Sequence, residues 1–144
     1  MKLKQLSLFL ENKPGALSRP VRLLAKAGFN ILTLSIADTH QFGILRLIMR
    51  DWEKAKQMLE QEGFVVKVTD MVPVEVSDQP GGLAKILDVL EKAGVNVEFM
   101  YAFTEKRCDE AVLMFRFDDP DQAIKILQRH KVHVVATRDL LAQA

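Results

Sequence analysis

The chain has 144 residues, of which 49% are hydrophobic, enough to bury one core or two very small ones. The chain has twenty basic and nineteen acidic residues, so its net charge is +1, which indicates neither a nucleic-acid partner nor binding to an anionic membrane. No apolar run approaches the roughly 18 residues of a membrane span, and no apolar signal region opens the chain, so we expect a cytoplasmic protein. The single cysteine, Cys108, excludes an internal disulfide.

The first half of the chain alternates between the periods of a strand and of a helix, in the order βαββαβ. The predicted elements are a strand over Lys4 to Leu10, a helix over Ala16 to Ala27, strands over Asn30 to Ala37 and Gly43 to Met49, a helix over Trp52 to Glu62 and a strand over Phe64 to Thr69. Asp51 is expected to cap the second helix. Pro20 conflicts with a long first helix, which either kinks there or begins after Ser18 as its cap.

The second half repeats this pattern. Pro14-Gly15 recurs 66 positions later as Pro80-Gly81, and Gly43-Ile44-Leu45 recurs 68 positions later as Ala111-Val112-Leu113. The repeat predicts strands over Val72 to Val76, Val95 to Phe103, Ala111 to Phe117 and Val132 to Val135. A helix is expected after Gly82, and another is expected to begin at Pro120 with Asp119 as its cap. Gly28 and Gly94 each follow a first helix, where a left-handed residue is expected.

Two βαββαβ units predict a tandem ferredoxin-like α+β protein, with antiparallel sheets and the helices on one face of each. We place the first domain at residues 1–70 and the second at residues 71–144. The join at Thr69-Asp70-Met71 has no Gly/Ser linker, so the two domains are expected to pack rigidly.

Each Pro-Gly turn lies between a predicted strand and a predicted helix. Glycine allows close approach of the backbone, and the first turn of a helix leaves N–H groups without intrahelical partners. A small anion such as a carboxylate fits this place. Turn formation alone also explains such Pro-Gly pairs, and that alternative stays open.

The segments Asn12-Lys13-Pro14-Gly15-Ala16-Leu17 and Ala27-Gly28-Phe29-Asn30-Ile31 resemble the ACT domain, a small regulatory module that binds amino acids. Leu10 to Arg19 is similar to the start of acetolactate synthase regulatory subunits, and the Asn12-to-Asn30 arrangement to the serine-binding module of phosphoglycerate dehydrogenase. Both copies fit, so the resemblance extends to about Ala136. The whole chain is most similar to stand-alone tandem ACT proteins.

The resemblance implies which residues hold an effector. The implied ligand-binding residues are Asn12, Pro14, Gly15, Ala16 and Asn30 in the first copy, and Asp78, Gly81, Gly82, Leu83 and Asn96 in the second. Asp78 departs from the family's asparagine, although a carboxylate there can pair with an ammonium group. Asn30 and Asn96 follow helix-ending glycines, and Asp78 precedes a helix, so these three residues also have structural explanations.

The residues give little support for catalysis. His40, His130 and His133 have no spacing typical of metal ligands, and we find no nucleophile motif or phosphate-binding loop, so we expect neither an enzyme nor a cofactor. Modules that bind RNA share the βαββαβ order. Phe115 and Phe117 share one face of a strand, but the basic, glycine-bearing motif of such modules is missing, so we expect these rings to be buried or at an interface.

The sequence therefore predicts an amino-acid sensor without catalytic activity, acting as a homodimer or through its paired domains. Its helix N-termini at Gly15 and Gly81 would hold the ligand's carboxylate. The alternative is a subunit that binds no ligand and docks onto an amino-acid biosynthetic enzyme such as acetolactate synthase.

Overall fold

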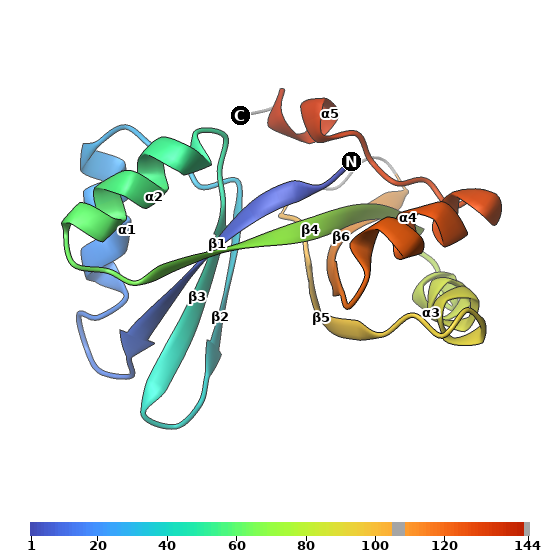
Figure 1. Ribbon diagram of the computed structural model, residues 1–144, viewed down its shortest axis with the longest axis horizontal. Coiled ribbons are helices and arrows are strands. Elements are labelled where there is room, and N and C mark those ends of the chain that lie inside the picture. Colours follow the sequence, from blue (N-terminus) through green and yellow to red (C-terminus); the bar gives the residue numbers. More distant parts are fainter. Residues whose placement is uncertain (105–108, 143–144) are drawn as a thin grey trace. The chain divides into compact units, whose positions relative to one another are not determined.

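The computed structural model describes residues 1–104 and 109–142, so Cys108 lies outside the described residues (Figure 1). The chain forms two compact units. The first unit comprises Lys4–Thr69, and the second comprises the described residues between 70 and 142 together with Met1–Leu3. Each unit combines an antiparallel sheet with helices, which confirms the predicted α+β class.

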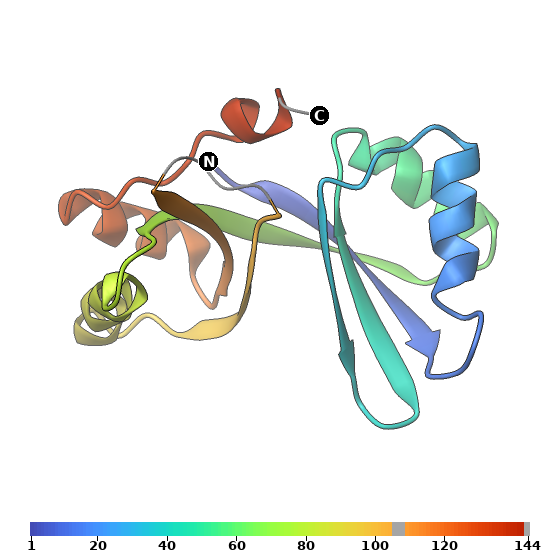
Figure 2. The same ribbon diagram turned by 180° about the vertical axis from the view of Figure 1, so that it is seen from behind.

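The first unit contains nearly all of β1 (Leu3–Glu11), then α1 (Ser18–Lys26), β2 (Thr33–Asp38), β3 (Phe42–Ile48) and α2 (Trp52–Gln61). Its strands run in the order β2-β3-β1, and both neighbouring pairs are antiparallel. The alternation of β1 buries Leu6, Leu8 and Leu10 on one face. Leu24 of α1 and Leu59 of α2 pack on that face, so both helices cover the same side of the sheet (Figure 2).

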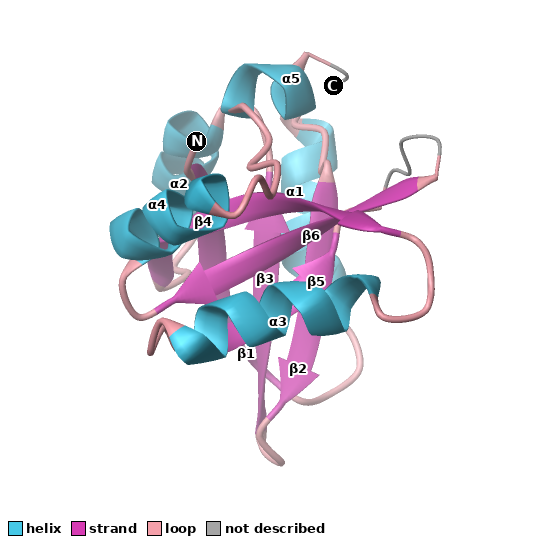
Figure 3. Ribbon diagram, turned by 90° about the vertical axis from the view of Figure 1, so that its right-hand side faces the viewer, coloured by secondary structure: helices cyan, strands magenta, loops and turns pink. Residues whose placement is uncertain are grey.

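The second unit contains most of β4 (Val66–Ser77), then α3 (Gly82–Lys92), β5 (Val97–Ala102), β6 (Glu110–Phe117), α4 (Pro120–Arg129) and α5 (Thr137–Leu141). Its strands run in the order β4-β6-β5 (Figure 3). Phe115 and Phe117 are fully buried and stack with ring centroids 5.3 Å apart, so they belong to the core and cannot stack on bases. Among the described residues, no helix has the length and apolar character needed to cross a membrane.

Several predicted boundaries were wrong. The strands expected over Phe64 to Thr69 and Val72 to Val76 are one strand, β4, because the join between them contains no turn-forming glycine. Helix α1 begins at Ser18, not at Ala16, which places Pro20 in the first turn, where a missing N–H costs no intrahelical hydrogen bond.

Later predictions also differ from the structure. Only Val134 of the last predicted strand forms a bridge, to Val74 of β4. The short helix α5 lies in the tail, to which the sequence assigned no element. Gly28 and Gly94 adopt positive φ angles of 81° and 72°, as expected for residues that end helices.

The two aspartates predicted as helix caps differ. Asp119 accepts a hydrogen bond from the Gln122 N–H of α4 at 3.1 Å, whereas Asp51 makes no side-chain capping bond to α2. Asp119→Ala is therefore expected to lower the free energy of unfolding by about 1 kcal/mol. Asp51→Ala, as the matched control, should have a much smaller effect in the same urea titration. Equal losses for the two variants would contradict this assignment.

Candidate functional site

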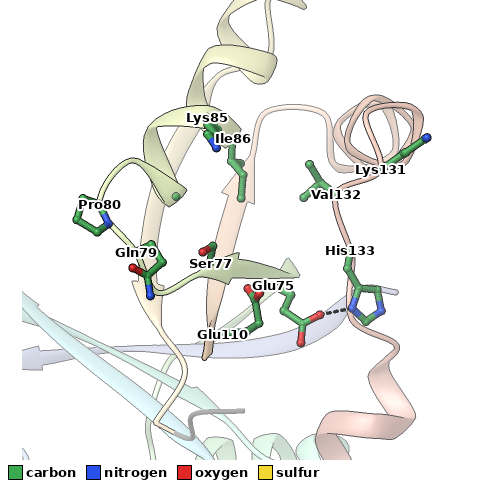
Figure 4. A pocket seen from close by; sticks show the side chains of 11 residues that line it. Glu75, Ser77, Gln79, Pro80, Lys85, Ile86, Glu110, Lys131, Val132 and His133 are labelled. Atoms are coloured by element: carbon green, nitrogen blue, oxygen red, sulfur yellow. Dashed lines mark hydrogen bonds and ion pairs between the residues drawn. The ribbon is translucent and has the colours of Figure 1, made fainter. Parts of the chain in front are cut away.

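A cavity of about 330 Å³ lies in the second unit, beside the turn between β4 and α3 (Figure 4). Three segments that are distant in the sequence line it: the end of β4 with the following turn and the start of α3, the first residue of β6, and residues 131–133. The Glu75 N–H donates to the His133 carbonyl at 2.9 Å, and this bond holds residues 131–133 beside β4. On the other side of β4, Ser77 pairs with Glu110.

The turn is fixed by two glycines with different roles. Gly81 has a φ of +88°, in the left-handed region that L side chains rarely adopt. Gly82 lies so close to β4 that an added Cβ would be 2.1 Å from the Ser77 carbonyl oxygen. The Gly82 N–H donates to the Gln79 carbonyl at 3.0 Å, and the Gly81 carbonyl accepts from the Lys85 N–H at 3.1 Å. Gly82 therefore has a structural role besides lining the cavity.

The cavity carries opposite charges on opposite sides. Glu75 and Glu110 lie at one end, and His133 Nδ1 contacts Glu75 Oε2 there (Figure 4). Lys85 lines the other side, from the first turns of α3, where the helix dipole adds partial positive charge. Ile86 and Val132 also line the cavity. This lining suits a small zwitterion, with its carboxylate near Lys85 and its ammonium group near the glutamates.

The other predicted residues of the second unit are placed differently. Asp78 lies in the turn, where its N–H donates to the Asp109 carbonyl at 3.0 Å, and Leu83 packs against the core. Asn96 donates its N–H to Asp118 Oδ1 at 3.1 Å, and it is not among the residues that line the cavity. Of the residues predicted in this unit, only Gly82 lines the cavity.

In the first unit, Asn12 and Asn30 line separate hollows of about 180 and 150 Å³. Asn12 Nδ2 donates to the His40 carbonyl at 3.0 Å, so this hydrogen bond links the β1–α1 turn to the β2–β3 hairpin.

The same turn contains an ion pair. The Lys13 ammonium lies 2.7 Å from the Glu11 carboxylate, and its hydrogen bond and charge lower the pKa of the Glu11 carboxyl.

The turn of the first unit otherwise resembles that of the second. After Pro14, Gly15 has a φ of +85°, close to that of Gly81. The Ala16 N–H donates to the Lys13 carbonyl at 3.3 Å, so this amide is engaged within the turn. The first unit thus forms the predicted turn but keeps the two asparagines apart.

The strand register and the repeat offsets show that three of the cavity residues have apolar counterparts in the first unit. Glu11 pairs with Phe42 as Ser77 pairs with Glu110, so Glu110 corresponds to Phe42. By the same offsets Glu75 corresponds to Phe9 and His133 to Val65. These apolar side chains are exposed, with exposed fractions of 50% for Phe42, 52% for Phe9 and 71% for Val65.

The place of Lys85 is taken in the first unit by Arg19. Its guanidinium lies 4.6 Å from the centroid of the Phe64 ring, and its Nη2 donates to the Glu62 carbonyl at 2.9 Å. The two units therefore both have a basic residue at this position, and they differ in the glutamates that replace Phe9 and Phe42. Among the described residues, no group of three or more His, Asp, Glu or Cys side chains could hold a metal ion.

The sequence analysis missed Glu75, Lys85, Glu110, Val132 and His133 as lining residues. Glu75 gave a weak signal, as a charged residue inside the apolar alternation of Val74 and Val76. That alternation shows only that Glu75 points away from the core. The cavity itself depends on packing between segments, which no local pattern contains.

Comparisons with known proteins give the family. Residues 1–144 match the family described as the ACT domain pair. A crystal structure of a protein from Bacteroides thetaiotaomicron is 40% identical, has a TM-score of 0.90, and aligns over 98% of this chain and 96% of that one. The regulatory subunit of aspartate kinase from Thermus thermophilus, in ligand-free form, shares the fold at 14% identity and a TM-score of 0.66, over 90% of this chain and 93% of that one.

A sequence relative is the acetolactate synthase small subunit of Buchnera aphidicola subsp. Baizongia pistaciae, which is 36% identical over 81 residues. The match covers 55% of this chain and 50% of that protein, so the chain matches about half the length of this curated relative. The match of the family over the whole chain and the paired ferredoxin-like units agree. The chain belongs to the family of ACT domain pairs.

Proposed function

We propose that this protein is a regulatory sensor that binds a free amino acid in the cavity of its second unit. The observation that carries the proposal is the lining of that cavity, with Lys85 and the N-terminus of α3 on one side and Glu75 and Glu110 on the other. An α-amino acid carries both complementary charges. A volume of about 330 Å³ lies within the usual range of roughly 300 to 1,000 Å³ for small-molecule sites.

Binding of an amino acid in this cavity would change the relative stability of the arrangements of the segments that line it. The β4–α3 turn and residues 131–133 both line the cavity, and residues 131–133 directly precede Val134, which bridges to Val74. A ligand that contacts both segments would stabilise one arrangement of them over others. A partner that distinguishes these arrangements would then respond to the amino acid, which is how a sensor without catalytic activity acts.

The proposal predicts that one or a few of the twenty amino acids raise the midpoint of thermal unfolding. At a hundredfold excess over the dissociation constant, the ligand should stabilise the native state by about 2.7 kcal/mol. Lys85→Met should remove most of this shift, because it removes the cation that pairs with the ligand's carboxylate. Lys125→Met, an exposed position on α4 away from the cavity, is the matched control and should keep the shift.

Two outcomes would contradict this proposal. The first is a chain that shows no shift with any amino acid at millimolar concentration. The second is a shift that Lys85→Met and Lys125→Met preserve equally.

A second candidate is docking onto an amino-acid biosynthetic enzyme without a ligand. It is favoured by the exposed apolar side chains Phe9, Phe42 and Val65 of the first unit, and by the similarity to an acetolactate synthase small subunit. Co-purification with a synthase, lost in Phe9→Ser and unchanged by free amino acids, would support docking over sensing.

A further inference from the structure

The acidic end of the cavity holds two carboxylates. Glu110 pairs with Ser77 in the register of β4 and β6, and Glu75 lies two residues before Ser77 on the same face. Glu75 and Glu110 are therefore diagonal neighbours, a spacing that long side chains can bridge. Figure 4 shows both carboxylate groups at the same end of the cavity. The α-ammonium group of an amino acid needs only one of them.

The fold does not require these carboxylates. The first unit builds the same register with Phe9 and Phe42 in their places. Two like charges on neighbouring strands repel each other, although less in a diagonal pair than in a directly opposite one. A positively charged occupant would relieve this repulsion.

Among the described residues, the basic groups around the cavity do not neutralise both members of the pair. His133 contacts Glu75, and no described basic side chain forms an ion pair with Glu110. Lys85 lines the opposite side, on α3, and the Lys131 side chain points away from the cavity (Figure 4). The complementary ligand therefore carries a negative group for the α3 side and positive charge for the glutamate end, where Glu110 has no basic partner among the described residues.

We propose that the ligand is an amino acid with a cationic side chain, such as lysine or ornithine; this rests on the function proposed above. Its carboxylate lies against Lys85 and the first turn of α3. One glutamate receives its α-ammonium group and the other its side-chain ammonium group. Its methylene groups lie against Ile86 and Val132, the apolar side chains that line the cavity.

Titration calorimetry of the intact chain with lysine, ornithine, norleucine and glutamate tests this proposal. Norleucine keeps the four-carbon side chain of lysine but lacks its terminal ammonium group. Lysine is expected to bind at least about tenfold more tightly than norleucine, since a charge-assisted hydrogen bond is lost without that group. Glutamate, with a second negative charge, should bind more weakly than either.

Variants of the two glutamates test whether they cause the preference for lysine over norleucine. At least one of Glu75→Gln and Glu110→Gln should lower the ratio of the lysine to norleucine affinities by about tenfold. Glu91→Gln, an exposed position on α3 that does not line the cavity, is the control and should leave the ratio unchanged.

The outcomes separate this inference from the function on which it rests. If norleucine or another neutral amino acid binds as tightly as lysine, or if neither glutamine variant lowers the ratio, the preference for a cationic side chain is wrong and the sensor remains. If no amino acid binds at all, both proposals fail.

Discussion

Gly82→Ala is expected to destabilise the second unit by about 3 kcal/mol. The added Cβ would lie 2.1 Å from the Ser77 carbonyl oxygen, a contact that real Cβ atoms do not make. The obstructing atom belongs to the backbone of β4, so it cannot move aside as a flexible side chain could. The turn or the start of α3 must shift instead. Differential scanning calorimetry of the purified variant measures the loss.

Gly43→Ala is the matched control for this prediction. Gly43 lies in β3, and its added Cβ would meet no atom closer than 3.7 Å, which is ordinary van der Waals contact. The free energy of unfolding of Gly43→Ala should differ from that of the wild type by less than about 1 kcal/mol. If Gly82→Ala unfolds like the wild type, the close approach of the turn to β4 is not as described.

Phe115→Ala is expected to lower the free energy of unfolding by about 4 kcal/mol. The ring is fully buried and stacks on Phe117 with an angle of 3° between the ring planes. Removing it takes away buried apolar surface and leaves a cavity in the core formed by β4, β6 and the helices. Guanidinium titration monitored by circular dichroism gives the change.

The control for Phe115 is Phe9→Ala, in a strand of the first unit. Phe9 is about half exposed, so its truncation should cost less than about 1 kcal/mol. A loss for Phe115→Ala as small as that for Phe9→Ala would show that Phe115 does not belong to the core.

The fold was largely predictable because its signals are local. Leu6, Leu8 and Leu10 alternate as a half-buried strand requires, and Pro120 after Asp119 marks the start of a helix. The repeat at 66 positions then gave the second unit. The continuity of β4 was missed, since the sequence shows that Thr69-Asp70-Met71 lacks a turn but not that both flanking segments extend as one strand.

The site was only partly predictable. The Pro-Gly turn of the second unit lies beside the cavity, and Gly82 lines that cavity. The charged lining was missed because Glu75, Glu110 and His133 come from three segments that only the folded chain brings together. Asn12 and Asn30, which the resemblance implies as ligand-binding residues, line separate hollows of the first unit, and their role stays a prediction.

The two units share one fold but differ in the side chains on the exposed sheet surface beside the turn. The turn geometry is kept, with Gly15 and Gly81 at φ angles of 85° and 88°. The open sheet face beside the turn differs, because Phe9 stands where the second unit has Glu75. Backbone positions that the fold needs are thus shared, whereas side chains that face outward are free to differ.

The most direct test of the central claim is a titration of the ¹⁵N-labelled chain with the amino acid that raises the unfolding midpoint, followed by amide chemical shifts. We expect the largest changes at Ser77, Gly82, Lys85, Glu110 and His133, the residues around the second unit's cavity. The amides of Asn12, Gly15 and Asn30 should change little. Changes confined to those first-unit residues, or no changes in either unit, would contradict binding in the cavity.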